Sequence, residues 1–350
     1  MNQKKTDKVN MAVIGLGVGR WHADSWTQTA NTRLVALCDA DEKKLTQAKE
    51  HYGVKGYTSY QELCEDEEVD AVSVCVPNYL HAPISIYALE HGKHVLCEKP
   101  LANTISAGEA MVSAAKKSGL VAMVAMKFRY TNEAVYIHRL LEEGKLGEIY
   151  YGWTTYLRQL GGIPGMGGWF TRKPLSGGGP MIDNGVHFLD VLWWLMGCPK
   201  PTRVSGATYA KFGPLGKGAS GWNRVPEPDE FSVEDLATAI IHFENGASVL
   251  IDNGWAGFVP SEVIGLRVMG TKGGATMWPF AVCEESEDGR VSTSVPDLTG
   301  SHVDTQFFHF ADCILNNKTP ISSFENCLTV LKMLCAVYES ADAKKEVEIL

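Results

Sequence analysis

The chain has 350 residues, with 32 Lys or Arg and 41 Asp or Glu, so its formal net charge is −9. At roughly 100–200 residues per domain, this length predicts two domains. Hydrophobic residues make up 45% and charged residues 21%, which is typical of a globular chain and excludes a disordered one. The acidic balance argues against nucleic-acid and membrane partners, because phosphate groups are bound by cationic patches.

The N-terminal residues and the cysteines predict a cytoplasmic protein. Residues 1–10 are polar and lack the apolar region and cleavage site of a secretory signal. The most hydrophobic stretch, Leu189–Met196, is too short for a membrane span, which needs about 20 apolar residues. The nine cysteines are odd in number and scattered singly, which predicts neither a disulfide framework nor a metal site.

The first third of the chain alternates between strand and helix patterns. Short apolar runs bounded by Gly or Pro are separated by segments of helical length. Because the runs are apolar throughout, we expect a doubly wound parallel sheet with helices on both faces. The predicted strands are residues 9–15, 34–39, 69–76, 94–97 and 121–126, and the predicted helices are residues 20–30, 43–52, 83–90 and 106–118.

After residue 129 the predicted strands become longer and alternate between apolar and polar residues, which is typical of half-buried antiparallel strands. Residues Glu244–Gly246 separate two such strands and predict a hairpin turn. We expect an α+β domain with a large, mainly antiparallel, open sheet. Its predicted strands are residues 150–156, 237–243, 247–255 and 265–269; the predicted helices are residues 132–143, 306–316 and 326–341, and residues 212–231 are predicted as a loop.

A glycine-rich turn follows the first predicted strand. Gly15 and Gly17 allow a tight turn and let a pyrophosphate approach backbone N–H groups at a helix N-terminus. Asp39 ends the second strand about 20 residues further on, where a carboxylate accepts from the ribose hydroxyls of NAD and repels the 2′-phosphate of NADP. The alternative is a turn needed only for chain geometry, with Asp39 capping the strand. The candidate cofactor contacts are Gly15, Gly17, Val18, Gly19, Arg20, which stands where the third glycine is usual, and Asp39.

The sequence Glu98-Lys99-Pro100 places a charged pair at the carboxyl end of a parallel strand, where open α/β sheets bind ligands. Because Lys99 precedes a proline, its backbone is restricted to extended conformations. A cationic nicotinamide would lower the proton affinity of this lysine, as the general base for alcohol oxidation requires. The structural alternative is a surface Glu–Lys pair before a helix.

Asp183 and His187 lie four residues apart on the predicted helix after Gly177–Pro180, so they share one face. A carboxylate and an imidazole so placed can bind sugar hydroxyls, and either can move a proton. The alternative is that both are structural polar groups on an amphipathic helix. On the same helix, Asp190 is interpreted as structural and Trp193-Trp194 as core or interface.

Four further side chains are candidates for substrate contact. Trp169 offers an aromatic face for a pyranose ring and Arg172 offers hydrogen bonds to its hydroxyls, whereas the alternative is a tryptophan that covers the core and an arginine in solvent. Tyr156 and Arg158 end a strand of the second domain. Lys127 leaves the last parallel strand and is a candidate cofactor contact.

Together these motifs resemble the glucose–fructose oxidoreductase, inositol dehydrogenase and rhizopine-catabolism family. The resemblance covers nearly the whole chain and is carried by residues 15–23, 76–81, 98–100, 177–187 and 234–255. It implies an N-terminal Rossmann domain that binds NAD, a cis peptide bond between Lys99 and Pro100, and Lys99 beside the nicotinamide and the substrate hydroxyl. It also implies that Asp183 and His187 face the nicotinamide, and that the cofactor is lined by Pro77, Asn78, His81 and Glu98.

The implied activity is the NAD-dependent oxidation of a secondary hydroxyl of a sugar, glycoside or cyclitol to the ketone. Lys99 and His187 would remove the hydroxyl proton, and the choice between them stays open; Asp183 would bind and orient the hydroxyl. The residues around Trp169 and 177–187 resemble the branch that oxidises C3 of glucosides. Inositol dehydrogenase, tightly bound NAD used in redox-assisted glycoside cleavage, and a cofactor-sensing regulator on the same fold are the alternatives.

The resemblance and the change of pattern together divide the chain in two. Residues 1–128 are predicted to form the NAD-binding domain, and residues 129–350 a domain for substrate binding and oligomerisation, whose C-terminal helices can return to the first domain. An open sheet with an alternating pattern must bury its outer face, so we expect a homodimer or homotetramer. The only other expected partner is a small carbohydrate or cyclitol.

Overall fold

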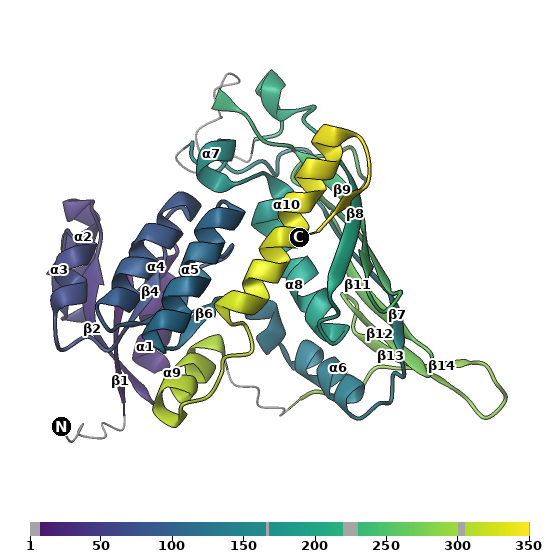
Figure 1. The fold of residues 1–350 in the computed structure, drawn as a ribbon, viewed down its shortest axis with the longest axis horizontal. Coiled ribbons are helices and arrows are strands. Elements are labelled where there is room, and N and C mark those ends of the chain that lie inside the picture. Colours follow the sequence, from purple (N-terminus) through teal and green to yellow (C-terminus); the bar gives the residue numbers. More distant parts are fainter. Residues whose placement is uncertain (1–7, 166–167, 220–229, 300–304, 350) are drawn as a thin grey trace. The chain divides into compact units, whose positions relative to one another are not determined.

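The computed structural model describes residues 8–165, 168–219, 230–299 and 305–349, which form two compact units. One unit contains residues 1–125 and 304–328, and the other contains residues 126–303 and 329–350. The polar residues 1–7 and residues 220–229 of the predicted loop lie outside the described residues. Figure 1 traces both units.

Six parallel strands form the sheet of the first unit, in the order β3-β2-β1-β4-β5-β6. Met11 and Val13 of β1 are completely buried, as expected for a strand with helices on both faces. The strand order reverses between β1 and β4, and such sheets bind ligands in the crevice at this point. The strands are β1 (Val9–Ile14), β2 (Thr32–Cys38), β3 (Lys55–Tyr57), β4 (Ala71–Val74), β5 (His94–Cys97) and β6 (Ala122–Val124).

The helices of this unit lie within two residues of their predicted bounds, except for Tyr60–Glu65, which was not predicted. Asp41 accepts hydrogen bonds from the first N–H groups of α2, and Gly53 ends that helix with a φ of +66°. Helix α9 comes from the C-terminal part of the chain (Figure 1). It places Phe307 against the ring of Trp26. The helices are α1 (Gly19–Gln28), α2 (Glu42–Tyr52), α3 (Tyr60–Glu65), α4 (His81–Glu90), α5 (Ile105–Ser118) and α9 (Gln306–Asn316), with a 3₁₀ turn at Asn78–Leu80.

Nine strands form the sheet of the second unit, in the order β14-β13-β12-β11-β7-β10-β9-β8-β15. The predicted hairpin is confirmed, because β9 and β10 pair antiparallel and Gly246 has a φ of +86°. The strands are β7 (Ile149–Leu157), β8 (Pro201–Tyr209), β9 (Leu236–Phe243), β10 (Ser248–Gly254), β11 (Val263–Gly270), β12 (Gly273–Met277), β13 (Ala281–Glu285), β14 (Val291–Ser294) and β15 (Val347–Glu348).

Two expectations for this unit were wrong. Strand β7 pairs parallel with β10 and antiparallel only with β11, because the long connection between β7 and β10, which contains α8, allows the crossover that parallel strands need. Asp183 does not lie on an α-helix but in a π-helical turn, Met181–Gly185, that precedes α8. The helical segments are α6 (Asn132–Glu142), α7 (Lys173–Ser176), α8 (Val186–Leu195) and α10 (Phe324–Ala343), with 3₁₀ turns at Lys127–Tyr130 and Gly213–Leu215.

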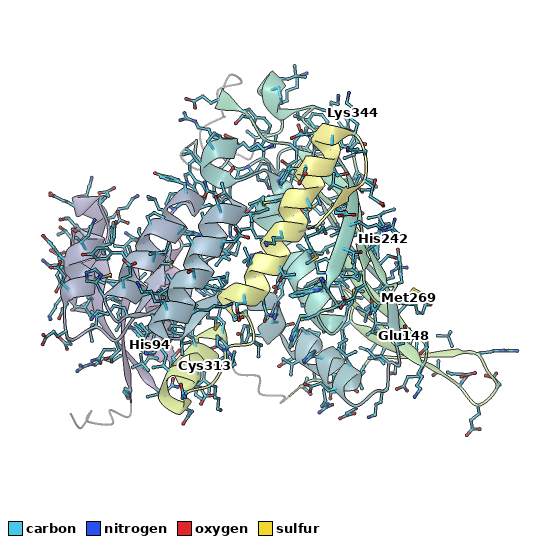
Figure 2. All side chains as sticks on the ribbon, viewed as in Figure 1. His94, Glu148, His242, Met269, Cys313 and Lys344 are labelled. Carbon is cyan, nitrogen blue, oxygen red and sulfur yellow. The ribbon has the colours of Figure 1, made fainter. Side chains whose placement is uncertain are left out.

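The two faces of the nine-stranded sheet differ. On the inner face, Gly152 of β7 lies directly under Leu192 and Met196, the end of α8. Ile240, His242 and Met269 lie on the outer face, and Ile240 and Met269 are half-exposed. Figure 2 labels His242 and Met269. Among the described residues, no helix is long and apolar enough to cross a membrane. The nine cysteines, all within the described residues, are free thiols.

Candidate active site

The three glycines in the turn after β1 have different structural roles. Gly15 has a φ of +92°, and a side chain there would overlap the carbonyl oxygen of Cys75. Gly17 has open space around it, so a ligand can approach its backbone. A Cβ on Gly19 would lie 2.8 Å from Cγ1 of Val13, so Gly19 allows α1 to pack closely on β1. Gly19 thus supplies the close helix packing for which this fold uses its third glycine.

The N-terminus of α1 is open to an anion. Val18 is the N-cap residue of α1 and is half-exposed, and its apolar side chain accepts no hydrogen bond from the helix. The first turn, which includes Arg20, has no acidic residue. The N–H groups of Arg20 and Trp21 donate to the carbonyl oxygens of Gly17 and Val18, so a pyrophosphate would contact the N–H groups that precede them at the N-terminus of this ten-residue helix. The turn and the helix end fit the pyrophosphate of NAD.

Asp39 stands directly after β2 and is held by backbone N–H groups. Its Oδ2 accepts from the N–H of Leu16 at 2.7 Å, and its Oδ1 accepts from the N–H of Asp41 at 2.8 Å. Each carboxylate oxygen keeps a second lone pair for a ribose hydroxyl. The same fixed charge would repel a 2′-phosphate, so Asp39 fits NAD better than NADP.

Asp39→Ala is expected to weaken NAD⁺ binding about tenfold, because two hydrogen bonds to the ribose are lost, and to narrow the preference for NAD⁺ over NADP⁺. Calorimetric titration of both cofactors measures these changes. Asp41→Asn is the matched control, since asparagine still caps α2 and should leave NAD⁺ affinity unchanged. Equal losses in the two variants would contradict the assignment of Asp39 to the ribose.

Lys99 lies two residues after β5, in a turn held from two sides. Its backbone N–H donates to Oε2 of Glu98 at 3.1 Å, and the Lys99–Pro100 peptide bond is cis, as the resemblance implied. The ring of His81 is completely buried, with Nδ1 2.7 Å from the carbonyl oxygen of Pro100 and Nε2 2.9 Å from that of Val76. His81 therefore connects this turn to the end of β4, where Pro77 and Asn78 follow.

The carboxylate of Glu98 is mostly buried. Its Oε1 lies 2.9 Å from Nε2 of His22. Burial acts to raise the pKa of Glu98, but the hydrogen bond and the charge interaction with His22, together with the charge of Lys99, outweigh it, so this pKa lies below its ordinary value. Glu98 is therefore ionised at neutral pH. Sequence reasoning did not find His22 as its partner.

In the second unit, His187 lies beside the side chains that follow β6. The ring centroid of His187 is 5.3 Å from that of Phe128. Nζ of Lys127 also lies 5.3 Å from the ring centroid of Phe128. Phe188, next to His187, stacks on Tyr156 of β7 at 5.3 Å. The structure thus brings Lys127, Tyr156 and His187 into one aromatic cluster.

Asp183 contacts the end of β10. Its Oδ2 accepts from Nε1 of the fully buried Trp255 at 3.1 Å. Asn253 lies two residues earlier on the same inner face; it is completely buried, and its amide atoms have no hydrogen-bond partner among the described residues. Buried amides normally have partners, so Asn253 is a polar group of this region that sequence reasoning missed. The alternation of β10 was the signal that could have placed it on the inner face.

Glu234 holds the start of the π-helical turn. Its carboxylate accepts from the N–H groups of Gly179 at 2.9 Å and Met181 at 3.1 Å, and from the hydroxyl of Tyr338 at 2.8 Å. A side chain on Gly178 would overlap that hydroxyl. The glycine run before Asp183 is therefore required by close packing against Glu234 and Tyr338.

Gly178→Ala is expected to reduce the free energy of unfolding by about 1–3 kcal/mol, because the added methyl overpacks the contact with Tyr338. Thermal unfolding followed by circular dichroism measures this loss. In the control variant Gly257→Ala, the new Cβ would lie 3.7 Å from the nearest atom outside its neighbours, which is an ordinary contact. Similar unfolding temperatures for the two variants would contradict the packing argument.

The remaining candidates have partners on the protein. Arg158 contacts Oε1 of Glu262 at 3.2 Å and donates to the carbonyl of Gly162 at 3.0 Å. Arg172 pairs with Glu230, and the Trp169 ring packs on Phe170 with centroids 4.1 Å apart. Two interpretations of the α8 residues hold: Asp190 forms a bidentate ion pair with Arg129, and Trp193 and Trp194 are buried. Within the described ranges no three His, Cys, Asp or Glu side chains gather as metal ligands.

Two family models match this chain. The model described as "Oxidoreductase family, NAD-binding Rossmann fold" matches residues 9–126, and the "GFO/IDH/MocA C-terminal domain" matches residues 134–276. The chain belongs to the Gfo/Idh/MocA oxidoreductase family. This confirms the family, the fold class and the NAD cofactor that the sequence predicted.

Relatives of this Gfo/Idh/MocA protein span most of its length. It is 28% identical to the D-glucoside 3-dehydrogenase of Escherichia coli K12, over 97% of both chains. It is 32% identical to a putative UDP-kanosamine synthase oxidoreductase subunit of Amycolatopsis mediterranei, over 77% of this chain and 75% of the relative. A crystal structure of an oxidoreductase domain protein from Kribbella flavida has a TM-score of 0.87 at 25% identity, covering 99% of this chain and 100% of that one.

Proposed function

We propose that this protein oxidises a secondary hydroxyl of a sugar or glycoside to the ketone, with C3 of a glucoside as the reacting position. Bound NAD⁺ supplies the hydride acceptor. The observation that carries the proposal is the turn of Lys99 at the carboxyl edge of the NAD-binding sheet, held through Glu98 and through His81. A fixed lysine at this edge is suited to take a proton from a substrate hydroxyl. The similarity to D-glucoside 3-dehydrogenase supports the position on the sugar.

Each of the candidate side chains has its own role in this reaction. Lys99 accepts the hydroxyl proton, with His187 as relay or alternative base, and Asp183 binds and orients the hydroxyl. The N–H that Trp255 donates to Asp183 fixes the direction of that carboxylate. The aromatic rings of Tyr156 and Trp169 bind the faces of the sugar ring, and Arg158 and Arg172 bind its outer hydroxyls.

The test mixes purified protein and NAD⁺ with hexoses, alkyl and aryl glucosides, 3-deoxyglucosides and inositols, and follows the absorbance of reduced nicotinamide. We expect reduction with glucosides and none with their 3-deoxy counterparts. Faster reduction with inositols would instead identify an inositol dehydrogenase. If no compound reduces NAD⁺, release of nicotinamide on denaturation would indicate a bound cofactor that is cycled, and its absence would favour a cofactor sensor.

We further propose that residues 1–128 bind NAD and residues 129–350 bind substrate and assemble the protein, in the cytoplasm, as a homodimer or homotetramer. The free thiols support the compartment. Two observations support the interface: Ile240 and Met269 are half-exposed on the outer sheet face, and Met269 lines a hollow of about 660 Å³ over β11–β14. Ile240→Lys is expected to shift the protein toward monomer in sedimentation analysis, whereas Lys116→Ala, on the exposed surface of α5, should not.

A further inference from the structure

A buried chain of hydrogen bonds runs from α1 to the Glu98 carboxylate. Nε1 of Trp26 donates to Oγ of Ser73 at 2.8 Å, and Oγ of Ser73 lies 3.2 Å from Nδ1 of His22. Nε2 of His22 lies 2.9 Å from Oε1 of Glu98. Trp26, Ser73 and His22 are completely inaccessible to solvent, so each of their polar hydrogens needs a partner inside the protein.

One arrangement of hydrogens gives every donor of this chain an acceptor. The indole N–H of Trp26 can only donate, so Ser73 accepts it and passes its own hydroxyl hydrogen to Nδ1 of His22. In this arrangement a hydrogen on Nε2 of His22 is donated to Glu98. The chain therefore ends on the ionised carboxylate of Glu98.

His22 has little freedom to leave this position. Its ring contacts Phe307 edge-on with centroids 5.0 Å apart, and Trp21 edge-on at 5.4 Å. Phe307 belongs to α9, so a helix from the C-terminal part of the chain packs against the imidazole of His22. The direction of the His22 N–H, and with it the position of the Glu98 carboxylate, is set by packing as well as by hydrogen bonds.

The carboxylate of Glu98 lies in the nicotinamide half of the cofactor site. In a sheet of this order, the two mononucleotide halves of NAD lie on opposite sides of the reversal between β1 and β4. Asp39 after β2 marks the adenosine half, so β4 and β5 belong to the nicotinamide half. Glu98 follows β5 directly. The nicotinamide ring is cationic when oxidised and neutral when reduced, so a fixed negative charge there distinguishes the two forms.

We propose that His22 is a positioning residue that holds Glu98 ionised at the nicotinamide end, and that this charge makes the protein bind NAD⁺ more tightly relative to NADH. The inference deepens the proposed function by assigning a preference for the substrate form of the cofactor and for release of its reduced form. It rests on the NAD site and on hydride transfer, not on which sugar is oxidised.

The experiment measures the dissociation constants of NAD⁺ and NADH by calorimetry, without any sugar, for the wild type and for Glu98→Gln. Glutamine keeps the shape of the side chain and removes its charge. We expect the ratio of the NADH constant to the NAD⁺ constant to fall about tenfold, as for a partly screened charge pair in a protein site. An unchanged ratio, whether or not both affinities fall, would overturn the proposal.

Two variants of His22 separate positioning from general stability. His22→Ala should lower the same ratio, whereas His22→Gln, whose amide can still donate to Glu98, should restore most of it. Phe307→Leu loosens the same region without changing a charge, so it should lower the unfolding temperature and leave the ratio unchanged. If Phe307→Leu moves the ratio as far as His22→Ala does, the role of His22 is only structural. Because no sugar is present, failure of the sugar assay leaves this result intact, and the reverse also holds.

Discussion

Lys99→Ala is expected to lower kcat for glycoside oxidation by about 10²–10⁴-fold, the usual contribution of a general base. The loss should appear in kcat and not in NAD⁺ affinity, because the cofactor contacts at the glycine turn and at Asp39 are untouched. Steady-state kinetics with the compound that reduces NAD⁺ in the absorbance assay measures kcat, and calorimetric titration measures NAD⁺ affinity.

The control for this prediction is Lys116→Ala, on the surface of α5, where the lysine pairs with Glu325 and its side chain is 65% exposed. This variant should keep wild-type kcat. His187→Asn decides between the two candidate bases: if it abolishes turnover while Lys99→Ala retains it, His187 takes the proton and Lys99 only binds. Full activity in both variants would refute the proposed chemistry.

Arg129→Met is expected to reduce the free energy of unfolding by about 3–5 kcal/mol, because it leaves a buried carboxylate without its partner. Nε and Nη2 of Arg129 lie 2.8 and 2.7 Å from the two oxygens of Asp190, and both side chains are almost completely inaccessible. The pair joins the turn that carries Lys127 to α8, which carries His187. Urea unfolding followed by fluorescence measures the loss.

The double variant Arg129→Met/Asp190→Leu should recover most of that stability, since replacing both members of a buried pair by apolar residues removes the unpaired charge. Arg139→Ala is the surface control: Arg139 is 59% exposed and lies 3.8 Å from Glu143, so its loss should change stability by less than about 1 kcal/mol. If Arg129→Met reduces the free energy of unfolding no more than Arg139→Ala does, the buried pair contributes little to stability.

The parallel sheet was predictable because its signals are local. Except for β3, each strand of the first unit is a short, largely apolar run, and Gly53 and Gly119 end helices in the left-handed conformation that glycine adopts at no steric cost. Strands β3, β8, β12, β13, β14 and β15 were not predicted; β3, for example, has three residues and no apolar run, and β12 begins with two glycines. Their pairing depends on neighbouring strands, which a local pattern does not contain.

The candidate site was predictable where one segment supplies a whole motif. The glycine turn, Asp39, Lys99 and the pair Asp183 and His187 all follow from short stretches of sequence. The π-helical turn at Asp183 was not visible, because it forms where Gly179 meets Glu234, 55 residues later, and Glu234 meets Tyr338, 104 residues later.

By itself, then, the sequence determined the family, the fold class and the NAD cofactor. Tertiary structure alone decided which partner each buried charge receives: His22 for Glu98, 76 residues away, and Arg129 for Asp190, 61 residues away. The physical reason is that burial and hydrogen bonding set the charge and direction of these groups. Both depend on side chains that the strand order brings together from distant parts of the chain.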